Sequence, residues 1–236
     1  MTWSIVAVDP VTREVGVGAA TCTVGVELVR GIVPGRGVVA AQASTNLAAR
    51  NKAVEAIRAG ASPEEVLNAA REASGRFGLS EWKDQQFAVA LLDPEPCAIV
   101  HTGAETVAWS GSRGAQAVSA QGNMIRGPEV VDVTLQAFAS EEGSPDLAER
   151  IMRGLEAGAE AGGDIRCPFE CPALTAFLAV AGPEEQNAEE PALYFVAPKA
   201  FGLKGALKHS LIPYTRKPGD PKPVAALRSM LDAARA

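Results

Sequence analysis

The sequence predicts an α/β protein of the α+β type, built as a four-layer α-β-β-α sandwich with two mainly antiparallel sheets at its centre. Two observations support this fold class. The expected elements follow one another as strands, helix pair, strands, helix pair and strands, the order that two packed sheets with an outer helical layer each would produce. With 236 residues, 47% of them hydrophobic, the chain can also bury one large core.

The chain opens with a predicted hairpin. Residues 2–8 read as an apolar strand, residues 9–12 as a turn, and residues 15–23 as a returning strand that is rich in small side chains. Residues 38–43 supply a third apolar strand.

Two helices are expected next, over residues 46–60 and 63–73, with a break between them. Ser62 can accept a hydrogen bond from an amide at the start of the second helix, and Glu65, three residues later, can reach back to close a capping box. Pro63 fits the first helical position. The second helix therefore has a well-defined start.

The rest of the chain continues this alternation. We expect an antiparallel meander, a pair of amphipathic helices, two further strands and a last helix. Their residue ranges are 86–92, 98–102, 106–109 and 115–120 for the meander, with a turn at 110–114; 128–140 and 145–161 for the helix pair; and 174–181, 193–197 and 223–234 for the remainder.

Charge is unevenly divided along the chain. The net charge is -6, yet residues 199–236 hold eight basic and two acidic side chains. We expect one domain over residues 1–198 and a basic C-terminal extension over residues 199–236, which packs on the acidic body or on a sister subunit. Because the amphipathic last helix needs a surface to cover, we also expect a homodimer or a higher homo-oligomer.

Composition argues against several classes of partner. An acidic chain is a poor nucleic-acid binder, because phosphate contacts need a clustered excess of Lys and Arg. No stretch approaches the roughly 20 consecutive apolar residues of a membrane span, and the start of the sequence lacks the basic segment of a secretory signal. We therefore expect a cytoplasmic protein with no nucleic-acid and no membrane partner.

Four cysteines in a chain of this length do not resemble the disulfide framework of a small secreted protein, so reduced thiols are expected. Cys167 and Cys171 flank Pro168 at a spacing that could hold a metal or form a redox pair, but zinc usually takes four ligands and no others lie nearby in the sequence. The glycines near residues 16–18 and 31–37 do not form a dinucleotide fingerprint. We expect no metal and no cofactor.

Five segments carry a family resemblance: residues 2–10 (TWSIVAVDP), 42–46 (QASTN), 121–124 (QGNM), 127–131 (GPEVV) and 162–166 (GGDIR). Together they resemble an uncharacterised Ntn-hydrolase-like family, a domain of unknown function related to the N-terminal nucleophile hydrolases. The resemblance covers roughly residues 2–181 and implies a sandwich related to proteasome subunits and amidohydrolases. Residues 20–25 (ATCTVG) depart from the family pattern, in which many relatives carry a Ser-Lys pair.

The resemblance implies a catalytic role for Thr2. In N-terminal nucleophile enzymes the first side chain attacks an amide, while its free α-amine, with a pKa of about 7.7 to 8.0, accepts the proton. Thr2 directly follows Met1, and a residue this small permits removal of the methionine. The alternative is that Thr2 merely begins an edge strand. Ser4 lies on the same strand face as Thr2 and is a second catalytic candidate.

Further candidates come from the other family segments. Gln121, Gly122 and Asn123 could donate hydrogen bonds to a developing oxyanion, or serve only as loop and cap residues. We assign Asn123 to catalysis, and Gln121 and Gly122 to substrate binding.

Asp164 could orient an amine during catalysis, and Arg166 could hold a substrate carboxylate, unless the two form a structural ion pair. Gln42 and Asn46 are expected to contact substrate. His101, at the end of a strand, is expected near a pocket mouth as a possible base, or else caps a turn.

These candidates define two functional hypotheses. The first is an N-terminal nucleophile amidohydrolase that acts on a small linear amide or short peptide. The second is a catalytically silent scaffold of the same fold, which binds a small metabolite or acts as an oligomeric assembly protein. The missing lysine favours the second. In both, a small molecule is the expected substrate or ligand.

Overall fold

The computed structural model of this protein describes residues 2–75, 80–143, 145–185, 191–197 and 222–236. It contains two antiparallel sheets. In spatial order, the first sheet consists of β10 (Leu193–Ala197), β9 (Thr175–Ala181), β2 (Val15–Thr21), β1 (Thr2–Val8), β8 (Val118–Asn123) and β7 (Ser110–Ala115). The second consists of β3 (Arg30–Val33), β4 (Gly37–Ala43), β5 (Gln85–Leu91) and β6 (Cys97–Thr102).

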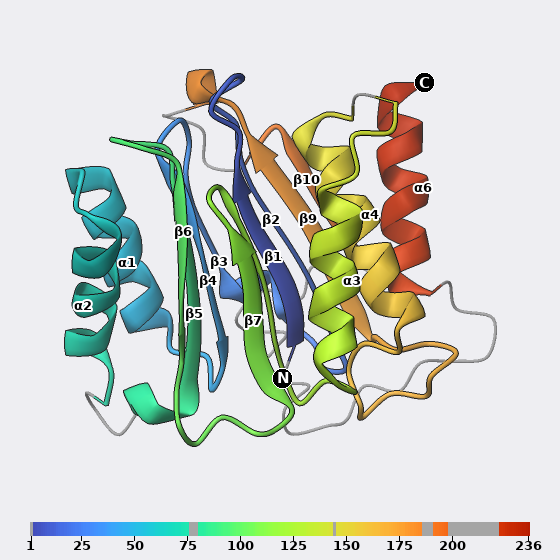
Figure 1. Cartoon of the computed structure of the whole chain (residues 1–236), viewed down its shortest axis with the longest axis horizontal. Coiled ribbons are helices and arrows are strands. Elements are labelled where there is room, and N and C mark those ends of the chain that lie inside the picture. The colour runs from blue at the N-terminus through green and yellow to red at the C-terminus, as the bar shows by residue number, and fades with distance from the viewer. Residues whose placement is uncertain (1, 76–79, 144, 186–190, 198–221) are drawn as a thin grey trace.

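Helices cover the outer face of each sheet (Figure 1). The four-stranded sheet is covered by α1 (Leu47–Ala59) and α2 (Pro63–Ala73), and the six-stranded sheet by α3 (Pro128–Phe138), α4 (Leu147–Glu160) and α6 (Pro223–Arg235). Short 3-10 turns occur as η1 (Val26–Val29), η3 (Trp82–Asp84) and η4 (Pro183–Glu185). The predicted α+β class with two antiparallel sheets is confirmed.

Three apolar clusters fill the spaces between these layers. One contains Phe87 and joins the four-stranded sheet to α1 and α2. A second contains Phe177 and lies between the two sheets. The third contains Trp3 and joins the six-stranded sheet to its helices. A Cβ atom added to Gly158 of α4 would lie 2.6 Å from Trp3 Nε1, and one added to Gly163 would lie 2.5 Å from the Trp3 ring, so two glycines make room for this side chain.

The predicted strand bounds in the second half of the meander were wrong. Residues 106–109 form no strand, the expected turn at 110–114 lies within strand β7, and β8 begins at Val118 rather than at residue 115. Turn-forming Ser and Gly residues occupy β7 because it is an edge strand, paired only with β8 and largely exposed at its end. Strand β3 was not predicted, because it has only four residues and two of them are Arg and Gly.

Helix starts follow their caps. The predicted capping box is confirmed, since the Ser62 hydroxyl accepts from the Glu65 amide and the Glu65 carboxylate accepts from the Ser62 amide at 2.8 Å. Helix α4 begins at Leu147, two residues later than residue 145, because Asp146 is the residue that caps it.

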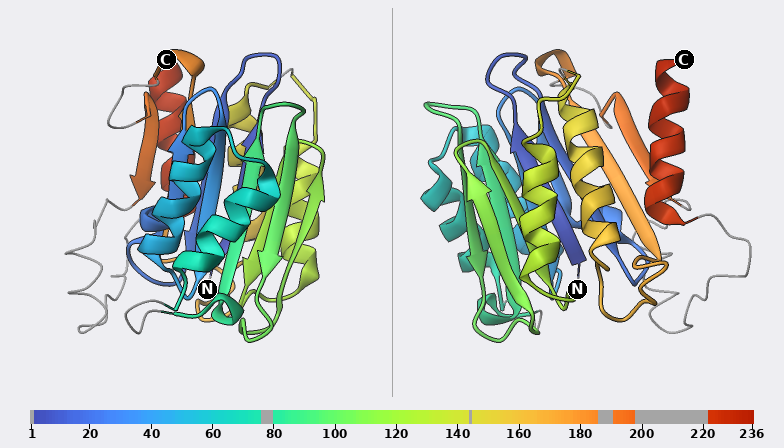
Figure 2. Two further views of the ribbon diagram at one scale, coloured as in Figure 1. Left: turned by 90° about the vertical axis from the view of Figure 1, so that its left-hand side faces the viewer. Right: turned by 45° about the vertical axis from the view of Figure 1, so that its right-hand side comes forward.

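The last helix packs on its own chain. Leu227 and Leu231 of α6 are fully buried against β9, β10 and α4 (Figure 2). Arg228 forms ion pairs with Glu149 at 2.7 Å and with Glu156 at 2.8 Å. The apolar face of α6 is therefore covered without a second subunit, so this face does not require the expected homodimer or higher oligomer. Residues 199–221 of the predicted extension lie outside the described residues.

None of the described helices is both long and apolar enough to cross a membrane. The cytoplasmic location stays a prediction.

Acid should loosen the contact between α6 and α4. Hydrogen bonding from Arg228 is the main cause that lowers the pKa of Glu149 to about 2, below its ordinary value of 4.5. The stability from this carboxylate is therefore present above about pH 4.5 and is lost as the pH falls toward 2. After solvent screening we expect roughly 1 to 2 kcal/mol.

Urea denaturation of the wild type and of Glu149→Gln at pH 7 and pH 3 measures this contribution. The difference in free energy of unfolding should shrink at pH 3 to less than half of its value at pH 7. Glu160→Gln, at an exposed position of the same helix, should show little difference at either pH. An equal effect of Glu149→Gln at both pH values would contradict the assignment.

Candidate active site

Ser4 of β1 connects the two sheets at their centre. Its hydroxyl donates to Gln42 Oε1 on β4 at 2.6 Å and accepts from Gln121 Nε2 on β8 at 2.6 Å. Ser4 therefore faces the opposite sheet, whereas Trp3 faces the helices. Because side chains alternate along a strand, Thr2 shares the inner face with Ser4, as predicted from the sequence.

The hydrogen bonds continue from Ser4 through Gln42 to Gln86 on strand β5. Gln42 Nε2 donates to Gln86 Oε1 on β5 at 2.7 Å and to the Thr2 carbonyl oxygen at 3.3 Å. Gln86 Nε2 then donates to the Gly122 carbonyl oxygen at 3.1 Å. With Asn123, whose Nδ2 donates to Gln86 Oε1 at 3.1 Å, these side chains form what we call the inter-sheet network: Ser4, Gln42, Gln86, Gln121 and Asn123. All five are buried, with at most 1% exposed surface.

Gln86 was not predicted as a site residue. Two adjacent glutamines, Gln85 and Gln86, begin an otherwise apolar strand, and both are fully buried. A buried amide requires partners, so this pair of glutamines was the signal that could have identified a polar network between the sheets.

Thr2 lies at the edge of this network. It is 4% exposed and pairs with Asn123 of β8 in the strand register. Asn123 Oδ1 is buried and has no hydrogen-bond partner among the described residues. Met1 lies outside the described residues, so the structure does not describe what precedes the Thr2 nitrogen. The start of β1 thus places Thr2 opposite a residue whose buried oxygen accepts no hydrogen bond from the described residues.

The expected oxyanion donors are engaged within the protein. The Gln121 amide group donates to Ser4, the Asn123 amide group donates to Gln86, and Gly122 pairs with Trp3 and with Gly111 in the strand register. The alternative of a loop-and-cap role for these residues was wrong, because β8 continues through Asn123. The polar side-chain atoms of this segment that remain without a hydrogen-bond partner among the described residues are two buried acceptors, Gln121 Oε1 and Asn123 Oδ1.

Asp164 and Arg166 form an ion pair beside the end of β2. The Asp164 carboxylate is fully buried and accepts from the Arg166 side chain at 2.5 and 3.0 Å, from the Arg166 amide at 3.0 Å and from the Cys22 amide at 2.8 Å. Donors of the protein itself therefore use the Asp164 carboxylate oxygens, which were expected to orient a substrate amine. This geometry is the structural alternative left open by the sequence.

A disulfide joins Cys22 to Cys167, next to this ion pair. The expectation of reduced thiols is wrong for these two residues. They are 145 residues apart, and they meet because Asp164 fastens its loop to the end of β2. Cys97 remains a thiol, and burial raises its pKa. No cluster of three or more His, Cys, Asp or Glu side chains that could hold a metal ion occurs in the described part of the chain.

Two predicted substrate contacts have other positions. Asn46 is 2% exposed and caps α1, where its Oδ1 accepts from the Ala49 amide at 3.1 Å. His101 stacks on Trp82 with ring centroids 4.0 Å apart, and it lies opposite Phe87 on the helix-covered face of its sheet. Its side chain is therefore separated from Thr2 by the sheet itself. Burial is the main cause that lowers the pKa of His101.

Two strands that border Thr2 end in an unusual backbone conformation. Ala43 at the end of β4 has φ 68°, and Met124, directly after β8, has φ 52°. Both values lie in the left-handed region, which non-glycine residues rarely adopt and which tends to occur at functional sites. The strand ends beside Gln42 and Asn123 are thus held in a strained conformation.

Comparison with known proteins identifies a family whose function is unknown. The model described as "Family of unknown function (DUF1028)" matches residues 2–194. Among solved structures, protein SPO2555 from Silicibacter pomeroyi, assigned to the same family model, is similar at 25% sequence identity with a TM-score of 0.72, covering 100% of this chain and 89% of that one. No curated protein matches.

Removing the Ser4 hydroxyl should destabilise the fold. Ser4→Ala leaves Gln121 Nε2 and Gln42 Oε1 without this partner in a buried site, so we expect the free energy of unfolding to fall by about 2 to 4 kcal/mol. Chemical denaturation measures the change. Ser119→Ala is a matched control on β8, because Ser119 is equally buried but donates only one bond, to the Arg113 carbonyl oxygen. An effect of Ser4→Ala no larger than that of Ser119→Ala would contradict the role of the network.

The disulfide predicts the reactivity of the cysteines. In denaturant without reductant, iodoacetamide should modify Cys97 and Cys171, and after reduction it should modify all four cysteines. Replacing Cys22 and Cys167 together by Ser should lower the free energy of unfolding by about 2 to 4 kcal/mol, whereas Cys97→Ser should change it little. Modification of all four residues without reductant would disprove the bond.

Proposed function

The chain belongs to the family of unknown function DUF1028, and we propose that it is an amide hydrolase with Thr2 as an N-terminal nucleophile. The observation that carries this proposal is the position of Thr2. It is the first residue of the central strand β1, it faces the space between two packed sheets, and it lies opposite Asn123, whose buried Oδ1 has no hydrogen-bond partner among the described residues. A small linear amide or short peptide is the proposed substrate.

The reaction requires Thr2 to be the first residue. Once Met1 is removed, the Thr2 hydroxyl oxygen attacks the amide carbonyl carbon and its proton passes to the Thr2 α-amine. The carbon–nitrogen bond then breaks, and the leaving amine takes that proton. Water adds to the resulting ester with the α-amine again as base, which releases the acid and restores Thr2.

The surroundings support this role for the amine. Residues directly opposite each other in an antiparallel pair have Cβ atoms about 5 Å apart. Asn123 is therefore a direct neighbour of Thr2, and we propose its Oδ1 as the acceptor that orients the Thr2 amine. The inter-sheet network holds the Thr2 carbonyl through Gln42 Nε2. The layered arrangement of two sheets between helices also supports a relationship to the N-terminal nucleophile hydrolases.

We first expect protein from its native host to have the mass of the chain without Met1. Against a library of small amides, Thr2→Ala should then lower kcat/KM at least about a thousandfold, whereas Thr2→Ser should retain measurable activity. Inserting a lysine between Met1 and Thr2 should block methionine removal and abolish activity while keeping the hydroxyl. Thr12→Ala, in the exposed turn after β1, is the matched control.

The pH profile tests the base. Activity should rise with pH through about 7.7 to 8.0, because the α-amine must be neutral to accept a proton. Full activity of Thr2→Ala, or of the lysine insertion, would disprove the mechanism.

A catalytically silent scaffold that binds a small metabolite is the second candidate. The observation in its favour is that the Asp164 carboxylate and the amide groups of Gln121 and Asn123 are all engaged within the protein. Retention of Met1 in the native protein would make this the better proposal.

A further inference from the structure

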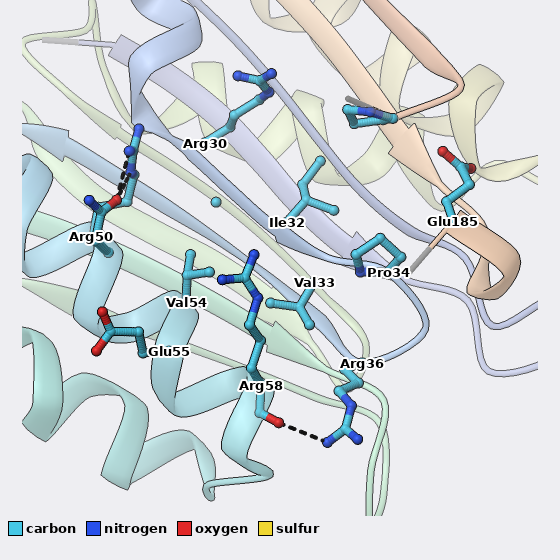
Figure 3. A pocket seen from close by; sticks show the side chains of 13 residues that line it. Arg30, Ile32, Val33, Pro34, Arg36, Arg50, Val54, Glu55, Arg58 and Glu185 are labelled. Atoms are coloured by element: carbon cyan, nitrogen blue, oxygen red, sulfur yellow. Dashed lines mark hydrogen bonds between the residues drawn. The ribbon is translucent and has the colours of Figure 1, made fainter. Parts of the chain in front are cut away.

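A cavity of about 600 Å³ lies along the edge strand β3, and none of the predicted site residues lines it. Helix α1 forms one wall, and the region of η4 forms the other (Figure 3). Its lining includes four arginines: Arg30, Arg36, Arg50 and Arg58. We call this cavity the arginine groove.

The carboxylates of the groove are engaged elsewhere. Only Glu55 and Glu185 line it among the described acidic residues. Glu55 pairs with Lys52 at 2.5 Å. Glu185 accepts from the backbone amide of Gly182 at 2.7 Å and from that of Ala192. Four arginines and two glutamates leave the lining of the groove with an excess of two positive charges.

Three of the arginines form no ion pair with a described residue. Arg50 donates from Nη1 to the Leu28 carbonyl oxygen at 2.6 Å and from Nε and Nη2 to Asn51 Oδ1 at 3.2 and 2.7 Å. Arg36 Nη1 donates to the Arg58 carbonyl oxygen at 3.2 Å, and Arg58 donates no side-chain hydrogen bond to a described residue. These acceptors are all neutral. Burial, followed by repulsion from Arg30, lowers the pKa of Arg50, which shows that like charges face one another here. A negative charge bound anywhere in the groove would oppose that repulsion.

The groove also has an apolar floor. Ile32 and Val33 of β3 and Val54 of α1 line it, and the Arg58 side chain extends between Val33 and Val54 (Figure 3). The volume is in the range of pockets that bind small molecules. Guanidinium groups bind phosphate and carboxylate oxygens in pairs. The ligand should thus combine an anionic group with an apolar body.

We propose that the arginine groove binds a small organic anion, with its phosphate or carboxylate group on Arg58 in the middle of the groove and its apolar body against Ile32 and Val54. This site is separate from Thr2, and the proposal does not depend on the hydrolase activity.

Calorimetric titration at constant ionic strength tests the proposal with three probes: phenyl phosphate, phthalate and inorganic phosphate. Arg58→Gln is the main variant, because the Arg58 side chain supports no hydrogen bond of the fold among the described residues and its loss should leave folding intact. We expect it to weaken binding of phenyl phosphate at least about tenfold. Arg71→Gln removes the same charge from α2, outside the groove, and should change affinity less than twofold.

The probes separate the ligand classes. Preference for phenyl phosphate identifies a phosphate ligand, and preference for phthalate identifies a carboxylate ligand; either supports the site. Phenyl phosphate should bind more tightly than inorganic phosphate because of the apolar floor, and amide chemical shifts should change along α1 and β3. No saturable binding of phenyl phosphate or phthalate by the wild type up to about 10 mM, or an equal loss with Arg71→Gln, would overturn the proposal.

Discussion

The hydrogen bonds of the inter-sheet network set the register on which the centre of the molecule depends. All seven residues of β1 are buried, so its apolar side chains alone do not determine which face meets the opposite sheet. A slip by one residue would turn Ser4 toward the helices and leave Gln42 and Gln121 without their shared partner. Each unpaired buried group costs about 1 to 3 kcal/mol. The polar residues thus determine which face of β1 meets the opposite sheet, because the apolar pattern alone does not.

The end of the sandwich that holds Thr2 is fastened in several independent ways. The network fixes β1 to β4 and β8 by hydrogen bonds, Asp164 fixes its loop to the end of β2, and a disulfide closes the same loop covalently. This concentration of restraint, together with the strained backbone of Ala43 and Met124, explains how a residue at the start of a strand can keep a defined orientation.

Local signals in the sequence predicted local structure well. The capping box at Ser62 and Glu65 was recognisable because its partners are three residues apart. Strand alternation placed Trp3 and Ser4 on opposite faces of β1, but it left open which of the two faces the other sheet. The fold class followed from the order of elements. Strand β7 could not be recognised because an edge strand tolerates Ser and Gly, residues that elsewhere indicate a turn.

The parts of the candidate site that depend on long-range pairing were not predictable. Nothing near Cys22 in the sequence indicates that Cys167 is its partner, and nothing near Asn123 indicates that its amide group donates to Gln86. His101 was misplaced for a related reason: its side of the sheet depends on the register of β6 against β5, which only the folded structure supplies. Which donors and acceptors of these residues are available thus depends on pairings that only the folded chain defines.

The burial of Trp3 has a practical consequence for handling the protein. Its ring is enclosed by Gly158 and Gly163, so β1 is immobilised one residue from Thr2. An affinity tag fused ahead of Thr2 would therefore be attached at this fixed point, directly to the proposed nucleophile. Helix α6 ends at the opposite end of the molecule, with Ala236 exposed (Figure 1). Purification handles and surface tethers therefore belong at the C-terminus.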